Sequence, residues 1–195
     1  MTQKEFDDRN KLGFEGDNHL ADEIKRLCEA NKIDLIIETG TYLGATTKRL
    51  AELAETYTVE LNDTFFMRAK TNIGNNPKVK QFLGNTVDFL KAELPKLKDK
   101  KILFFLDAHF YNVPCPLLDE LKVIAQNEIK PVIVIHDFKV PERPEFGFDS
   151  YNNQPFEWEW IKNSIEKIYG QNYKYHYNDK AEGAKRGVIF IYPNE

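Results

Sequence analysis

The sequence contains few cysteines and no long hydrophobic run. Of its 195 residues, two are cysteines, Cys28 and Cys115. No stretch of about 18 consecutive apolar residues occurs, so we expect no membrane-spanning helix. The first ten residues are polar and acidic and lack the apolar segment of a secretory signal peptide. Two thiols without such a signal predict reduced cysteines in a cytoplasmic protein.

Concentrated positive charge is also missing. The formal net charge is -4, and the lysines and arginines are scattered apart from a short cluster at 96–101. A protein that binds duplex nucleic acid needs a continuous basic face, so we expect neither nucleic acid nor a membrane as a partner. Hydrophobic residues make up 42% and charged residues 30%, which is typical of a globular chain. The length predicts a single domain over residues 1–195.

What the sequence does contain is an alternation of short apolar runs with apolar residues at helical spacing. This alternation is typical of βαβ units and predicts an α/β fold with a mostly parallel sheet and helices on both faces. Only a short loop joins the last two runs, so we expect them to form an antiparallel hairpin. The seven predicted strands are 33–37, 57–61, 79–83, 102–106, 132–135, 173–177 and 188–192.

Two segments lie outside this regular pattern. Residues 1–31 are predicted to form an N-terminal helical extension, with Cys28 on the apolar stripe of its helix. Residues 139–155 hold three prolines and are predicted to form an irregular loop that acts as a lid. Five nearby aromatic residues form either an acceptor pocket or a small apolar cluster: Tyr111, Phe138, Phe146, Phe148 and Tyr151.

A glycine-containing turn follows the first predicted strand, and its sequence is Glu38-Thr39-Gly40-Thr41-Tyr42-Leu43-Gly44. Glycine lets backbone approach a ligand closely, and the N-terminus of the following helix carries partial positive charge. A tight turn with no ligand is the simpler interpretation. The candidate cofactor-binding residues of this turn are Glu38, Thr39, Gly40, Thr41, Tyr42 and Gly44.

Polar residues also end the second and third predicted strands. Glu60 lies about 20 residues beyond the turn, where nucleotide-binding folds place the acid that binds the ribose hydroxyls. A solvated carboxylate at a strand end is the alternative. Asn85 follows the third strand, where an amide serves equally well as a helix cap or as a ligand to the cofactor.

The fourth and fifth predicted strands each end in an acid, Asp107 and Asp137. If these strands are neighbours, the two carboxylates lie close together, and a divalent cation or a shared proton would relieve their repulsion. His109 and His136 lie at the same sheet edge, and either is a candidate to accept a proton from a hydroxyl group. Asp107, His109, His136 and Asp137 are therefore the candidate catalytic residues, and Asp107 and Asp137 the candidate metal ligands.

The order of these motifs, from the turn at Gly40 through Glu60 and Asp107 to Asp137, resembles the class I S-adenosylmethionine-dependent methyltransferases. It is similar in particular to bacterial and phage proteins classed as methyltransferase-like, over about residues 34–138. The resemblance implies that the turn cradles the methionine part of S-adenosylmethionine and that Asn85 faces the adenine. The strand-end acids resemble those of metal-dependent O-methyltransferases, which implies magnesium or manganese at Asp107 and Asp137.

The resulting hypothesis is methyl transfer from S-adenosylmethionine to a small acceptor, as O-methylation of a sugar or polar metabolite, with metal assistance at the acids. The first alternative is a module that binds the cofactor without catalysing transfer. The second is an iron-dependent oxygenase whose ligands would be Asp107, His109 and His136.

Overall fold

The computed structural model describes residues 11–109 and 114–194, and it contains a seven-stranded sheet in the order β3-β2-β1-β4-β5-β9-β8. Strands β1 to β5 pair in parallel, whereas β9 runs antiparallel to both β5 and β8. The main strands are β1 (Leu35–Thr39), β2 (Glu55–Glu60), β3 (Val79–Leu83), β4 (Ile102–Leu106), β5 (Val132–His136), β8 (Tyr173–Tyr177) and β9 (Val188–Pro193). The predicted α/β fold with a terminal antiparallel hairpin is confirmed.

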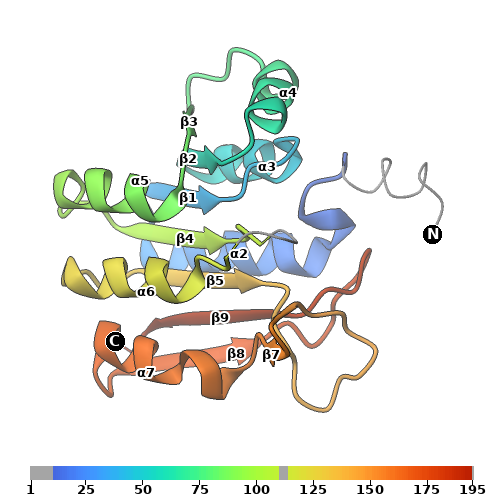
Figure 1. Cartoon of the computed structure of the whole chain (residues 1–195), viewed down its shortest axis with the longest axis vertical. Helices are drawn as coiled ribbons and strands as arrows, with labels where there is room; N and C mark the ends of the chain where they lie inside the picture. Colours follow the sequence, from blue (N-terminus) through green and yellow to red (C-terminus); the bar gives the residue numbers. More distant parts are fainter. Residues whose placement is uncertain (1–10, 110–113, 195) are drawn as a thin grey trace.

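Helices cover both faces of this sheet (Figure 1). One face carries α5 (Thr86–Glu93), α6 (Leu117–Gln126) and α7 (Trp158–Tyr169), with the short 3₁₀ helix η2 (Leu94–Lys96) after α5. The other face carries α2 (Asn18–Asn31) and α3 (Ala45–Leu53), and α4 (Asp63–Ile73) packs beside α3. The 3₁₀ helix η1 (Phe14–Gly16) precedes α2. No helix in the described parts of the chain is long and apolar enough to cross a membrane.

The core lies in two layers because side chains on successive strand residues point to opposite faces. In β4, Phe104 packs with the layer under α5, α6 and α7, whereas Leu103 and Phe105 pack under α2 and α3. Strands β1, β4 and β5 are buried on both faces, as expected for central parallel strands. Cys28 lies in the second layer, as predicted.

The first strand begins later than the apolar run indicates. The run 33–37 was predicted to form it, but β1 begins at Leu35 and continues through Glu38 and Thr39, which are both buried. The carboxylate of Asp34 accepts a hydrogen bond from the Lys101 backbone at 3.0 Å, just before the amino ends of β1 and β4. The strand thus carries polar side chains into the interior just before the glycine turn.

The segment 139–155 is more regular than predicted. It contains a two-stranded antiparallel hairpin, β6 (Ser150–Tyr151) paired with β7 (Gln154–Pro155). Asn152 and Asn153 connect the strands with φ values of 51° and 63°, the left-handed backbone that asparagine tolerates in tight hairpin turns. The expectation of an irregular loop is therefore wrong for residues 150–155, and the lid role stays a prediction.

Candidate functional site

A cavity of about 840 Å³ opens at the carboxyl ends of β1, β2 and β4. Most of the predicted site residues line it: Gly40, Thr41, Tyr42, Glu60, Asn85, Asp107, His109 and Asp137. Four others are close by in sequence but do not line it: Glu38, Thr39, Gly44 and His136. A smaller cavity of about 370 Å³ lies at the amino ends of β1, β4 and β5, and none of the predicted site residues lines it.

The turn after β1 requires glycine at Gly40. Its φ is 89°, and a Cβ atom there would lie 2.3 Å from the backbone oxygen of Asp107. The backbone of the first strand thus approaches the end of the fourth strand more closely than any side chain permits. Gly44, with φ of 76°, is the N-cap of α3, whose first residues Ala45 and Thr46 line the cavity.

Glu38 supports this turn from the interior. Its Oε2 atom accepts hydrogen bonds from the hydroxyls of Thr47 at 2.5 Å and Thr58 at 2.6 Å. Burial raises the pKa of the Glu38 carboxyl to about 8, against the lowering effect of the two hydroxyls. The hydroxyl of Thr41 lies 2.6 Å from that of Thr58, so the network connects the buried carboxyl to the cavity wall.

Glu60 ends β2 with its carboxylate held by backbone. Oε2 accepts from the Tyr42 amide at 2.8 Å and Oε1 from the Asn62 amide at 2.9 Å. Each carboxylate oxygen can accept further hydrogen bonds, so the fixed carboxylate keeps acceptor capacity toward the cavity. Glu60 is thus a fixed carboxylate at the cavity, and its role toward a ribose stays a prediction.

Asn85 acts as the N-cap of α5. Its side-chain oxygen accepts from the amides of Val87 at 2.9 Å and Asp88 at 3.2 Å. The predicted capping role is confirmed, while contact with an adenine stays a prediction. Tyr42 and Phe65, whose ring centroids lie 4.7 Å apart, give the cavity an aromatic wall.

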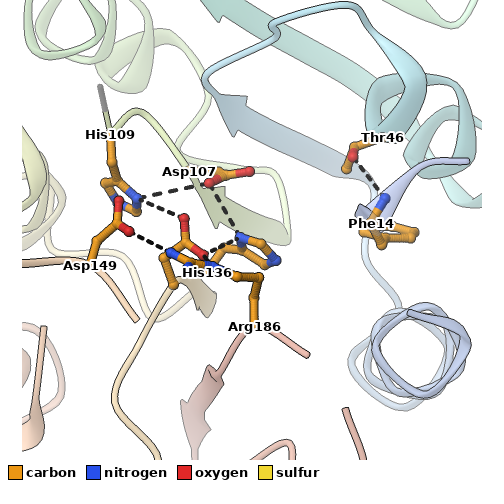
Figure 2. Close-up of polar contacts among 8 residues, drawn as sticks. Phe14, Thr46, Asp107, His109, His136, Asp149 and Arg186 are labelled. Carbon is orange, nitrogen blue, oxygen red and sulfur yellow. Dashed lines mark hydrogen bonds and ion pairs between the residues drawn. The ribbon is translucent and has the colours of Figure 1, made fainter. Parts of the chain in front are cut away.

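Asp107 and Asp137 are neighbours at the ends of β4 and β5, as predicted. Figure 2 shows Asp107 beside His109 and His136. His136 lies behind them, with Nδ1 3.4 Å from Asp107 Oδ1 and 3.3 Å from Asp137 Oδ1. These are ion-pair distances without hydrogen-bond alignment. Burial favours the neutral imidazole, but the two carboxylates hold the pKa of His136 well above its usual value.

Arg186, from the loop before β9, ion-pairs with both Asp137 and Asp149. Burial opposes ionisation of the Asp137 carboxyl. Its pKa is nevertheless held well below the usual range by three neighbours, His136, His109 and Arg186. The backbone at Asp137 has φ of 58°, a left-handed conformation that turns its side chain out of the strand. Asp137 is thus fixed as a carboxylate beside Asp107.

His109 is the histidine that faces the cavity. Its side chain is 1% exposed, and Nδ1 lies 3.8 Å from Asp107 Oδ1 and 3.9 Å from Asp137 Oδ2. Neither ring nitrogen has a hydrogen-bond partner among the described residues, although both are buried. Asp107, His109 and Asp137 place one ligand atom each within 4.8 Å of one another. His136 does not belong to this group, so the ligand set predicted for an iron oxygenase is wrong.

Of the two interpretations of the aromatic residues near 139–155, an acceptor pocket or an apolar cluster, the described residues support the cluster. Phe138 and Phe146 are buried in apolar clusters, Phe148 is 41% exposed, and Tyr151 packs against the core. None of these side chains lines the cavity. Tyr111 lies outside the described residues.

Several residues in or near the site were not predicted from the sequence. Glu120, in the first turn of α6, is 1% exposed, and burial raises the pKa of its carboxyl. Its spacing from Leu117 and Ile124 is the detectable signal, because it falls on the apolar face of α6. The other missed residues, Gly13, Glu15, Phe65, Asp149 and Arg186, have no comparable local signal.

Known structures share this fold at low sequence identity. The O-methyltransferase of Bacillus cereus, in complex with S-adenosylhomocysteine, is 16% identical, with a TM-score of 0.60 over 100% of this chain and 92% of that chain. The O-methyltransferase TomG of Streptomyces achromogenes, in complex with S-adenosylmethionine, is 16% identical, with a TM-score of 0.60 over 90% and 80%. Cofactor-bound Rv0187 from MTB is 16% identical, with a TM-score of 0.62 over 98% and 87%.

The sequence matches no protein-family model, and no curated protein matches it. Structural similarity also extends to a precorrin 8W decarboxylase of Methanobacterium thermoautotrophicum, which is 15% identical, with a TM-score of 0.52 over 89% of this chain and 90% of that chain. The chain therefore has the fold of these methyltransferases, but a fold hosts more than one chemistry. The function has to be argued from the site.

Proposed function

We propose that this protein is an S-adenosylmethionine-dependent methyltransferase that methylates a hydroxyl oxygen of a small acceptor. The observation that carries the proposal is the single cavity that joins the Gly40 turn, Glu60 and the group Asp107, His109 and Asp137. Two structural neighbours with this fold are O-methyltransferases solved with the cofactor or its product. The two unpaired cysteines are compatible with a cytoplasmic location.

The cofactor would span the cavity from α3 to α5. Its carboxylate suits the amino end of α3, where backbone N–H groups and the helix dipole favour an anion. Glu60 would accept hydrogen bonds from the ribose hydroxyls, and the adenine would lie near Phe65 and Asn85. In this orientation the sulfonium would lie close to Asp107 and the acceptor close to His109.

Transfer itself needs alignment more than strong acid–base catalysis, because the sulfonium is already activated. The acceptor oxygen would form a bond to the methyl carbon while the carbon–sulfur bond breaks and its electron pair returns to sulfur. His109 would take the hydroxyl proton, since its ring nitrogens are buried at the cavity without a hydrogen-bond partner among the described residues.

The same three side chains also fit a divalent cation, as two carboxylates and an imidazole with converging ligand atoms. Manganese suits this mixed set better than magnesium, which prefers oxygen ligands. A bound ion would lower the pKa of the acceptor hydroxyl. His109 would then hold the ion instead of the proton, so chelation separates the two forms of the mechanism.

The proposal is tested by measuring S-adenosylhomocysteine formation with a panel of catechols, sugars and hydroxy acids, with and without EDTA. We expect turnover with at least one hydroxylated acceptor, and His109→Gln should abolish it while changing cofactor affinity by no more than about twofold. Loss of activity in EDTA, restored by manganese, would assign His109 to the metal. Cofactor binding without turnover of any acceptor would leave a binding module instead.

A further inference from the structure

The short segment Gly13–Gly16 has a backbone that few sequences tolerate. All four residues have positive φ, with values of 66°, 50°, 51° and 81°. The two central residues are Phe14 and Glu15, for which this conformation is unfavourable. Such strain persists only where the surroundings enforce it, and it often marks a ligand site.

Helix α3 holds this segment from one side. Phe14 is 3% exposed and packs edge-on against Phe105, while its backbone N–H donates to the hydroxyl of Thr46 at 2.9 Å (Figure 2). A Cβ atom at Gly13 would lie 2.8 Å from the side chain of Arg49 and 3.0 Å from the backbone oxygen of Ala45. The segment therefore lies directly against the first turn of α3, where the cofactor carboxylate is expected.

The loop between β8 and β9 holds the segment from the other side. The backbone oxygen of Glu15 accepts from the Ala184 amide at 3.3 Å, and a Cβ atom at Gly183 would lie 2.3 Å from that oxygen. Asp17, just beyond, is buried and accepts from the Asn178 side chain at 2.8 Å. The position of Glu15 is thus fixed by two parts of the fold that are distant in sequence.

Gly13 and Glu15 both line the large cavity, together with Thr41 and Thr46. Among the described residues, four acids line this cavity: Glu15, Glu60, Asp107 and Asp137. Backbone amides hold Glu60 at the ribose position, and Asp107 and Asp137 face His136, with Asp137 also held by Arg186. Glu15 is the acid that lies beside α3.

The methionine part of the cofactor carries an ammonium group next to its carboxylate. If the carboxylate meets the amino end of α3, the ammonium group is one carbon atom away from that point. We propose that Glu15 binds this ammonium group, and that the segment Gly13–Gly16 selects ligands that carry the amino-acid part. This inference rests on the proposed function, since it assumes that the cavity takes S-adenosylmethionine.

The test compares two ligands by titration calorimetry: S-adenosylhomocysteine, and 5′-methylthioadenosine, which lacks the ammonium and carboxylate groups. Glu15→Gln should weaken binding of S-adenosylhomocysteine about tenfold to hundredfold, the usual effect of losing a hydrogen bond to a charged group. Binding of 5′-methylthioadenosine should change by less than about twofold. Glu29→Gln, on the exposed face of α2, is the matched control and should leave both affinities unchanged.

A purely structural role for Glu15 would weaken both ligands equally, and that outcome would overturn the inference. If Glu15→Gln bound S-adenosylhomocysteine as tightly as the wild type does, the inference would also be overturned, whereas the proposed function would stand. If the wild type bound neither ligand, the proposed function itself would fail, and this inference with it.

Discussion

The buried carboxyl of Glu38 shows how a single residue makes the stability of the protein depend on pH. Burial raises the pKa of its carboxyl to about 8, well above the value of about 4.5 in the unfolded chain. Between these pH values the folded protein keeps a proton that the unfolded chain has released. Stability therefore falls as pH rises through this window, and the full contribution is present only below about pH 4.5.

We expect Glu38→Gln to remove this pH dependence. Measured by denaturant unfolding, the wild type should lose up to a few kcal/mol between pH 4.5 and 8 relative to the variant. The variant keeps a side-chain oxygen for the hydroxyls of Thr47 and Thr58, so the two proteins should differ least at the acidic end. Parallel stability curves for both proteins across this window would contradict a raised pKa.

Glu60 provides a second prediction for a single residue. Glu60→Ala removes the acceptors expected for the ribose diol, so affinity should fall about tenfold to hundredfold for S-adenosylhomocysteine. Because 5′-methylthioadenosine has the same ribose, its affinity should fall by a similar factor. Calorimetry with both ligands thus distinguishes Glu60 from Glu15, and unchanged affinity for both would remove Glu60 from the ribose site.

Individual strands and turns differ in how much their sequence reveals. Strands β3, β4 and β8 have the predicted bounds because apolar residues mark both of their ends. The end of β1 was misplaced because Glu38 and Thr39 are polar yet buried, and periodicity alone does not identify a buried polar network. The missed hairpin at 150–155 did leave a signal, since Asn152-Asn153 is a pair that favours a tight two-residue turn.

The glycine turn is the element on which the site depends most. Gly40→Ala would place an alanine at a positive φ, with its Cβ atom 2.3 Å from the backbone oxygen of Asp107. The carboxyl ends of β1 and β4 would therefore have to separate. We expect a loss of several kcal/mol in unfolding free energy and loss of cofactor binding. Gly170→Ala, at the end of α7, is a control because its φ is 68° but nothing lies within 4 Å of the added Cβ atom. Equal stability losses in both variants would show that the close approach at Gly40 is unimportant.

The whole molecule brings together residues that no local pattern connects. Topology placed Asp107 and Asp137 side by side, and topology follows from the order of apolar runs, so this pair was predictable. The contacts of Arg186 with Asp137 and of Asp17 with Asn178 depend instead on loops whose paths have no periodic signal. The same holds for Glu15, whose place beside α3 depends on the loop before β9.

The central claim is that the cavity at the carboxyl ends of β1, β2 and β4 binds S-adenosylmethionine. The most direct test is calorimetric titration of the purified protein with S-adenosylmethionine and S-adenosylhomocysteine, with NAD as the competing nucleotide. We predict one site per chain for the first two ligands, a higher melting temperature when either is present, and no binding of NAD. Binding of NAD without any response to S-adenosylmethionine or S-adenosylhomocysteine would contradict the account.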